Sequence, residues 1–260
     1  MMRLKHIYTL SVILLASSFV ACQQEDLPIT QEIEQTQGVH TQNADGLCDQ
    51  SEAVKAQYEE DAIRLALELG DRNSEPNIYV EGDSYQQAMD ALMAIYNAKR
   101  LAARDSVFEQ YDIHVRADYN LRKITIGLDA NYAWTRSWLS GQQITGNSEV
   151  DKMVETYRLA LAYHDTDRTY VTLEAERPLN IEQLGRLFSE VEGVQYTDQE
   201  WEIGEAGHIE MRQIDDHWEV SFSIGYGDCQ AGCIFRHYWE FNVFDDCQVE
   251  YTGSYGDPAP

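Results

Sequence analysis

Hydrophobic residues recur every three to four positions in several segments of the first two-thirds of the chain. This spacing places them on one face of an α-helix. It predicts a helix from Asp49 to Gly70, whose first four residues have the capping-box pattern, and further helices that begin at Ser84 and Ser148. Gly70 directly after the last hydrophobic position is typical of a helix end.

Between the predicted helices, hydrophobic residues alternate with polar ones, as they do in strands with one buried face. The alternation predicts a strand from Leu121 to Leu128. It also predicts a strand-helix-strand unit over 170–175, 180–191 and 194–196. The first two-thirds of the chain is therefore expected to mix helices and strands.

The last fifty residues show the most regular alternation. They predict a meander of four antiparallel strands, joined by short polar turns, with one buried and one exposed face. The residues expected on the buried face are, strand by strand, Ile209 and Met211; Trp218, Val220, Phe222, Ile224 and Tyr226; Phe235, His237, Trp239, Phe241 and Val243; and Cys247, Val249 and Tyr251. The chain is thus predicted to adopt an α+β fold, with a mixed N-terminal part and a C-terminal four-strand meander.

Opposing hydrophobic rows also fix the register of these strands, because a shift of one residue would turn a buried face outward. This rule places Phe222 opposite Trp239, and Trp239 opposite Tyr251. It leaves a three-residue turn over 244–246 and an irregular loop over 227–234.

The first 21 residues have the pattern of a secretory signal peptide, because two basic residues precede a hydrophobic run over 7–20. A membrane-spanning helix needs a longer run, of about 18 or more hydrophobic residues. The segment Phe19-Val20-Ala21-Cys22 resembles the lipobox of bacterial lipoproteins, although that family usually has leucine in place of Phe19. The resemblance implies cleavage before Cys22 and acylation of its sulfur, as in palmitate-bearing lipoproteins. Ordinary cleavage after Ala21 is the alternative.

The residues after Cys22 refine the expected location. Because Gln23 rather than aspartate follows the cysteine, the lipoprotein resemblance implies sorting to the outer membrane. The run Gln23-Gln24-Glu25-Asp26 is similar to an acidic tag that exports some lipoproteins to the cell surface, and a periplasm-facing anchor is the alternative. Residues 22–48 contain six glutamines, no Lys or Arg and no periodicity, so they are predicted to form a flexible tether. A single α+β domain is predicted over 49–260.

Acidic residues dominate the charge of the chain, with 45 Asp and Glu against 19 Lys and Arg and a formal net charge of −26. This charge disfavours binding to nucleic acid and to anionic lipid surfaces, since both attract basic residues. It favours a cationic partner or simply a well-solvated surface. The expected partners are membrane lipid, through acylated Cys22, and an unknown protein or small-molecule ligand. No cofactor is predicted.

The cysteines after the tether allow two interpretations. Cys229 and Cys233 lie in the loop 227–234, and together with His237 and Cys247 they have the residue types of a zinc site. Along one strand, however, Cys233 and His237 are about 13 Å apart and Cys247 is roughly 30 Å further, whereas zinc ligands lie within about 2.3 Å of the metal. An oxidising compartment also favours disulfides. We therefore predict a Cys229–Cys233 disulfide, no metal, and by elimination a Cys48–Cys247 disulfide, among the three complete pairings that four cysteines allow.

Few residues suggest a site by type and spacing. His237 lies in a hydrophobic row, which predicts a core histidine, and the alternative is a general base beside Asp228. Trp134 and Trp138 are spaced to share a helical face, where they either pack in the core or form a binding platform. Tyr226, next to the cysteine loop, is the other candidate binding residue. The remaining histidines beside predicted turns and strand ends are expected to be solvated: His114, His164, His208 and His217.

The common signatures of serine hydrolases, zinc proteases and nucleotide-binding proteins are absent from the sequence. The chain is therefore predicted to be a lipid-anchored protein of the cell envelope, at the outer membrane or the cell surface, that serves as a binding or structural module. Two alternatives stay open. One is a hydrolase without a familiar motif that uses Asp228 and His237, and the other is an acidic inhibitor or immunity-like protein that masks a basic partner.

Overall fold

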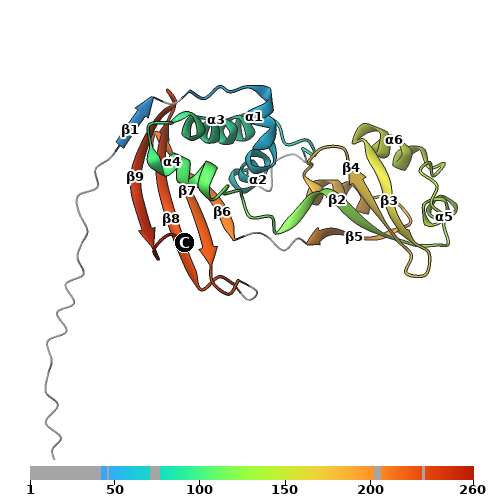
Figure 1. The fold of residues 1–260 in the computed structure, drawn as a ribbon. Coiled ribbons are helices and arrows are strands. Elements are labelled where there is room, and N and C mark those ends of the chain that lie inside the picture. The colour runs from blue at the N-terminus through green and yellow to red at the C-terminus, as the bar shows by residue number, and fades with distance from the viewer. Residues whose placement is uncertain (1–41, 46, 71–76, 202–205, 230–231) are drawn as a thin grey trace, which may run out of the picture. The chain divides into compact units, whose positions relative to one another are not determined.

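The computed structural model describes residues 42–45, 47–70, 77–201, 206–229 and 232–260. The predicted signal peptide, Cys22 and most of the predicted tether lie outside these ranges. Within the described residues, the structure contains helices and two antiparallel sheets (Figure 1). The predicted α+β class is confirmed.

The larger sheet contains the C-terminal meander and one strand from the N-terminal side. Its strand order is β1-β9-β8-β7-β6, and every neighbouring pair is antiparallel (Figure 1). The predicted meander is confirmed as β6 to β9. The strands are β1 (Gln42–Asp45), β6 (Gly207–Ile214), β7 (His217–Tyr226), β8 (Phe235–Phe244) and β9 (Gln248–Gly256).

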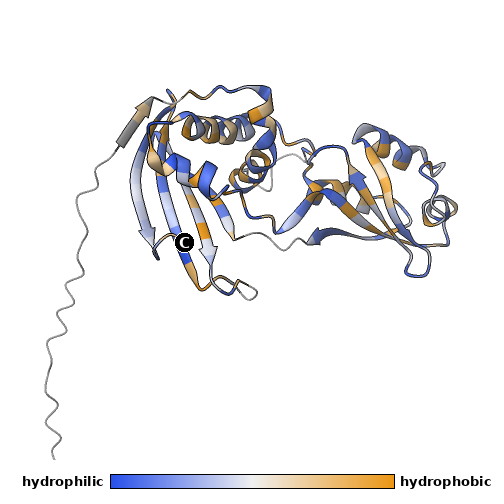
Figure 2. Ribbon diagram, viewed as in Figure 1, coloured by the Kyte–Doolittle hydropathy of each residue, from blue (hydrophilic) through white to orange (hydrophobic). Residues whose placement is uncertain are grey.

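One face of the larger sheet packs on helices, because each strand carries a row of hydrophobic residues on that side. Val220, Phe222 and Phe241 are buried in one hydrophobic cluster with Leu92 and Ile95 of α3. These helices carry both hydrophobic and hydrophilic residues, as expected of amphipathic helices that pack on a sheet (Figure 2). The helices are α1 (Glu52–Gln57), α2 (Glu59–Leu69), α3 (Asp83–Asn97), α4 (Ala102–Asp105) and the π-helical turn η1 (Ser106–Gln110).

The smaller sheet has the strand order β3-β4-β2-β5, again with only antiparallel neighbours. In chain order its elements follow the β-α-β-β-α-β scheme of the split βαβ motif, with two helices in the first connection. They are β2 (Tyr119–Leu128), α5 (Ala133–Leu139), α6 (Ser148–Thr156), β3 (Leu159–Asp165), β4 (Tyr170–Ala175), α7 (Ile181–Ser189) and β5 (Val194–Trp201).

A second hydrophobic cluster lies between this sheet and its helices. Ile124 and Leu173 from the strands are buried in it with Trp138 of α5, Val150 of α6 and Phe188 of α7. The three helices therefore share one face of the sheet. Because side chains alternate along a strand, the residues between the buried ones point to the opposite face of the sheet.

The predicted helix from Asp49 to Gly70 is interrupted. Tyr58 ends α1 with φ −108° and ψ 11°, and α2 begins directly after it. The Tyr58 side chain is buried, and its ring packs edge-on against Phe108 at 5.4 Å between centroids. The capping box predicted over 49–52 is wrong, because α1 begins at Glu52, so that Ser51 rather than Asp49 is the N-cap residue, and Ser51 makes no side-chain capping hydrogen bond.

The register between β7 and β8 is confirmed, because Phe222 lies opposite Trp239. The predicted register between β8 and β9 is wrong, since Tyr251 faces Phe241 rather than Trp239. The cause is the turn. Cys247 lies within it and adopts a left-handed conformation, φ 65°, as the last residue of three-residue hairpin loops commonly does. The loop is thus displaced by one residue from its predicted position, and the strand pairing shifts by two.

The tether predicted over 22–48 includes a strand at its end. Residues 42–45 form β1, which pairs with β9 and places Ala44 opposite Val249. Ala44 is buried. The sequence did not predict this strand, because four residues with a single apolar side chain show no alternation.

Both predicted cysteine pairs are close enough to form disulfides. Cys48 bonds to Cys247, 199 positions later, with 5.5 Å between their Cα atoms. Cys229 and Cys233 form the second disulfide, across four positions. Among the described residues, no group of three or more His, Cys, Asp or Glu is placed to hold a metal ion.

We expect the two disulfides to differ in their contribution to stability, because a crosslink stabilises more when it closes a longer loop. Loop-closure entropy gives about 5 kcal/mol for a loop of roughly 200 residues and about 2 kcal/mol for a loop of about five. Cys48→Ser with Cys247→Ser should therefore lower the free energy of unfolding, measured by urea denaturation, by more than Cys229→Ser with Cys233→Ser. Equal losses in the two double variants would contradict this expectation.

Candidate functional site

The structure gives His237 a partner other than the predicted Asp228. Its Nδ1 lies 2.6 Å from the carbonyl oxygen of Asp257, and its ring packs edge-on against Trp239 with 4.4 Å between centroids. A carbonyl oxygen only accepts, so Nδ1 carries the proton. Asp228 is exposed in the segment after β7. Neither residue lines the two cavities described below.

The two tryptophans of α5 pack against the core, which is one of the two arrangements that their spacing allowed. Trp138 is fully buried, and its ring lies against Phe188. Trp134 packs edge-on against Trp138 at 5.6 Å and donates its indole N–H to the carbonyl oxygen of Glu192. Both residues lie on the face of α5 that meets the sheet, with Trp138 inside the hydrophobic cluster and Trp134 partly buried against it. Tyr226 stacks on Phe235, and its hydroxyl donates to the carbonyl oxygen of Pro258 at 2.5 Å.

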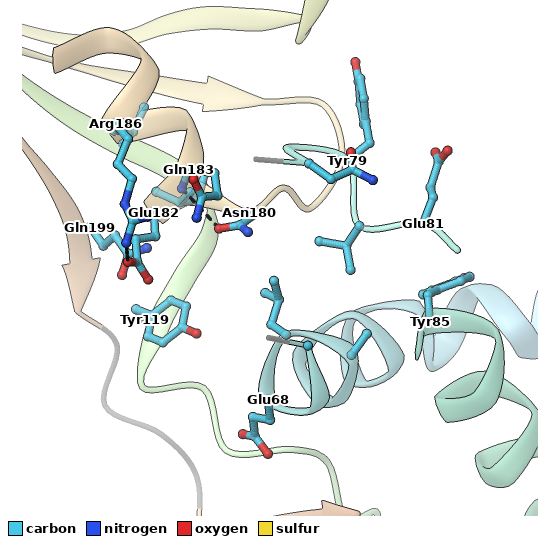
Figure 3. Close-up of a pocket in the computed structure, with 18 of the residues that line it drawn as sticks. Glu68, Tyr79, Glu81, Tyr85, Tyr119, Asn180, Glu182, Gln183, Arg186 and Gln199 are labelled. Atoms are coloured by element: carbon cyan, nitrogen blue, oxygen red, sulfur yellow. Dashed lines mark hydrogen bonds and ion pairs between the residues drawn. The ribbon is translucent and has the colours of Figure 1, made fainter. Parts of the chain in front are cut away.

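A cleft with a volume of about 800 Å³ is lined by residues of α2, α3, α7 and β5 and the segments beside them (Figure 3). This volume is within the usual range for small-molecule sites, about 300–1,000 Å³. Asn180 positions one wall, because its side chain accepts a hydrogen bond from the Gln183 N–H at 3.2 Å and so caps α7. The capped helix presents Glu182, Gln183 and Arg186 to the cleft.

Four aromatic side chains line this cleft: Tyr79, Tyr85, Tyr119 and Trp201. Trp201 is the most unusual, since 81% of its surface is exposed at the end of β5. Burial raises the pKa of Tyr85, which keeps its hydroxyl protonated and able to donate. Sequence reasoning missed these residues. The available signal was a tryptophan within the polar stretch over 198–202, where no hydrophobic row requires one.

Acidic and amide groups supply the polar lining of the cleft. Arg186 is the one arginine or lysine among the lining residues, and its guanidinium pairs with Glu182 at 2.5 Å (Figure 3). Further carboxylates come from Glu68, Glu81 and Asp83. Amide side chains come from Asn77, Asn180, Gln183 and Gln199. The cleft therefore combines aromatic surface with hydrogen-bonding groups and a negative charge.

A second cavity, of about 540 Å³, lies on the face of the smaller sheet opposite α5 to α7. We call this surface the tyrosine face. It is defined by Tyr163, Tyr170, Tyr196, Glu174, Asp198 and Glu200. Thr125 and Thr172 occupy its centre, with their hydroxyl oxygens 3.1 Å apart.

Two further polar groups are buried in the larger cluster. Asp61 accepts hydrogen bonds from the Val115 N–H and from the His114 ring, each at 2.7 Å. Arg104 donates to the Tyr96 carbonyl oxygen and pairs with Asp105 and with Glu109. The Asp61 contacts join segments more than fifty residues apart, whereas the Arg104 contacts are local and neutralise a buried charge, so both groups have a structural role. His114 is only partly solvated, since its ring stacks on Tyr58 and 35% of its side chain is exposed. His208 departs further from the expected solvation, because only 19% of its side chain is exposed.

Comparisons with protein families, with curated proteins and with solved structures find no match to the chain. Among the described helices, none has the length and hydrophobicity that crossing a membrane requires.

His208 provides a test of the hydrogen bonding around β6. Its Nδ1 accepts the Arg116 N–H at 3.2 Å, which requires an unprotonated nitrogen. Burial lowers the pKa of His208 and outweighs the opposing effect of Glu210. Because the unfolded chain then binds the proton more tightly, this contribution to stability is complete above the ordinary histidine pKa of about 6.5 and decreases as the pH falls below it.

We therefore expect the unfolding free energy to decrease more steeply between neutral and mildly acidic pH in the natural protein than in His208→Asn. Asparagine can accept the same N–H without titrating. Denaturant unfolding at several pH values measures both slopes, and parallel slopes would refute the assignment.

Proposed function

We propose that this protein is a lipid-anchored binding module of the cell envelope, whose cleft takes an uncharged ligand rich in hydroxyl groups, such as a saccharide. The observation that carries the proposal is Trp201, 81% exposed at a cleft that is otherwise lined by amides, carboxylates and tyrosines. An exposed tryptophan loses water-contacting apolar surface when a ligand stacks on it, and that burial favours binding.

The lining suits such a ligand in two ways. A sugar ring has C–H faces that pack on an aromatic ring, and its edge carries hydroxyls that both donate and accept hydrogen bonds. Asn77 and Gln199 offer both a donor and an acceptor, and the carboxylate of Asp83 offers acceptors. Polar groups that fix orientation within an aromatic pocket are the usual arrangement in small-molecule sites.

Charge disfavours an anionic ligand in the cleft. The carboxylates of Glu68, Asp83 and Asp198 line it. The two arginines at or beside the lining are already paired, Arg186 with Glu182 and Arg177 with Glu81. A phosphate or carboxylate group in this cleft would meet like charges and would lose its hydration without gaining a cationic partner.

The proposed location follows from the sequence. Nineteen residues separate Cys22 from β1, and in an extended conformation they span roughly 60 Å at about 3.3 Å per residue. A lipid on Cys22 would therefore leave the cleft within reach of ligands in the surrounding aqueous space.

The cleft proposal is tested by calorimetric titration of the detergent-extracted protein with uncharged tetrasaccharides of glucose, mannose and N-acetylglucosamine. We expect Trp201→Ala to weaken the binding of the best ligand about tenfold or more, which corresponds to about 1.4 kcal/mol. Tyr255→Ala is the matched control, because it removes another exposed aromatic ring, one that lies on β9. Equal effects of both variants, or binding of only a uronic acid tetrasaccharide, would refute the proposal.

The anchor is tested separately by metabolic labelling of growing cells with an alkyne analogue of palmitate. The natural chain should carry the label in the membrane fraction, and Cys22→Ala should lose both the label and the membrane association. A labelled Cys22→Ala protein would show that another residue is acylated.

A further inference from the structure

We infer that the tyrosine face of the smaller sheet is a second binding site, and that it takes a basic segment of a partner protein through arginine or lysine side chains. This site lies on the opposite side of the sheet from α5, α6 and α7, and among the described elements only strands line it. The inference does not depend on the ligand proposed for the cleft, and Asp198 is the one residue that lines both cavities.

The tyrosines form a row across three strands because a glycine separates two of them. Gly127 of β2 lies opposite Tyr170 of β4 on one side and opposite Tyr196 of β5 on the other. A Cβ atom on Gly127 would lie 2.0 Å from a ring atom of Tyr196, so the tyrosine ring covers the backbone of β2. Tyr163 extends the row, with its ring centroid 5.7 Å from that of Tyr170.

These rings are available to a partner. Tyr163 is 50% exposed and Tyr196 is 48% exposed. Neither ring is needed to fill the hydrophobic cluster, which lies on the other face of the sheet. Tyrosine is enriched among the residues that contribute most to protein interfaces, because it offers a rigid apolar ring and a polar hydroxyl. An exposed aromatic row on a sheet face that no described helix covers therefore indicates a contact surface.

Carboxylates lie beside this row. Glu174, Asp198 and Glu200 come from β4 and β5, and Lys123 of β2 is the one basic residue among those that line the cavity. The Lys123 Nζ lies 4.0 Å from a carboxylate oxygen of Glu200. Glu174 and Asp198 are exposed. The face is therefore negatively charged, like the chain as a whole, whose formal net charge is −26.

The charge decides between two kinds of partner. Aromatic residues on a four-stranded sheet can stack nucleic-acid bases, as they do in one class of RNA-binding domain. Three carboxylates against one lysine would repel the phosphate backbone, whose attraction to basic residues supplies most of the affinity in such complexes. An aromatic row among carboxylates instead matches cationic side chains.

Arginine and lysine fit both parts of the face. A guanidinium or ammonium group gains cation–π energy over a tyrosine ring and an ion pair with a carboxylate. The net charge of the chain would also accelerate the approach of a basic partner at low ionic strength. Exposed ion pairs alone contribute little, so the tyrosines should provide much of the affinity.

The inference is tested with a fluorescein-labelled peptide of alternating glycine and arginine, whose binding to the full chain is followed by fluorescence anisotropy. We expect binding that weakens as salt rises, and no binding of the corresponding glycine–glutamate peptide. Glu174→Gln with Asp198→Asn should weaken the arginine peptide about tenfold, and Tyr163→Ala should weaken it by a similar factor.

The matched control is Glu155→Gln with Glu190→Gln, which removes two exposed carboxylates from α6 and the end of α7. It should change peptide affinity less than about twofold, because those residues are not on the tyrosine face. Equal losses of affinity in the two double variants would show that the net charge of the chain, and not the tyrosine face, attracts the peptide, and would overturn the inference. Undiminished binding by Tyr163→Ala would overturn it as well.

Two other outcomes identify a different occupant and would also overturn the inference. One is binding of labelled poly(U) that Tyr163→Ala abolishes. The other is self-association of the natural chain, measured by sedimentation velocity, that Tyr163→Ala abolishes. Thermal unfolding followed by circular dichroism verifies that each variant is folded, and Tyr163→Phe, which keeps the ring, should retain peptide binding.

Discussion

Each of the two sheets is covered by helices on one face, and this one-sided burial determines where the remaining features lie. In the larger sheet, Val220, Phe222 and Phe241 point toward α3, so the residues between them point away. In the smaller sheet, Ile124 and Leu173 point toward α5, α6 and α7, which leaves the tyrosine face on the other side. Because side chains alternate along a strand, the positions that are buried on one face determine which residues lie on the other face.

The two hydrophobic clusters differ in how far apart in the sequence their contacting residues lie. The smaller sheet and its helices come from one continuous stretch, 119–201. The larger cluster is built from residues before and after that stretch, and its sheet joins β1 to β9 across most of the chain. Loop closure over such separations is entropically costly, so contacts of the larger cluster are expected to form late in folding.

The parts of the fold that were predictable are those with a local pattern. The meander followed from the alternation over the last fifty residues, since each of its strands buries one face. The β8 to β9 register was not predictable, because the left-handed conformation of Cys247 is unusual for a residue other than glycine. Nor was the interruption at Tyr58, whose position depends on packing against residues far along the chain.

The cavities were less predictable than the fold, because they combine residues from several elements. Trp201 lies in a stretch where polar side chains dominate, so its periodicity is that of an ordinary exposed position. Tyr163 follows the run Leu159-Ala160-Leu161-Ala162, so the sequence does not distinguish it from a buried hydrophobic position. The tryptophan pair in α5 illustrates the converse. Trp134 and Trp138 have the spacing of a platform, but the same spacing directs them into the core. Spacing predicts that side chains share a face, whereas the neighbouring elements determine whether that face is open.

The position of the Cys48–Cys247 disulfide has a mechanical consequence. It lies three residues after β1, so a pull applied from the N-terminal side first acts on the four residue pairs between β1 and β9. Those hydrogen bonds can break one after another, but the disulfide then transmits the force directly to the turn between β8 and β9. Tension would thus bypass α1, α2 and α3. For a pull between the two ends of the described chain, the load passes from Cys48 through the disulfide into β9, and the three helices lie outside this path.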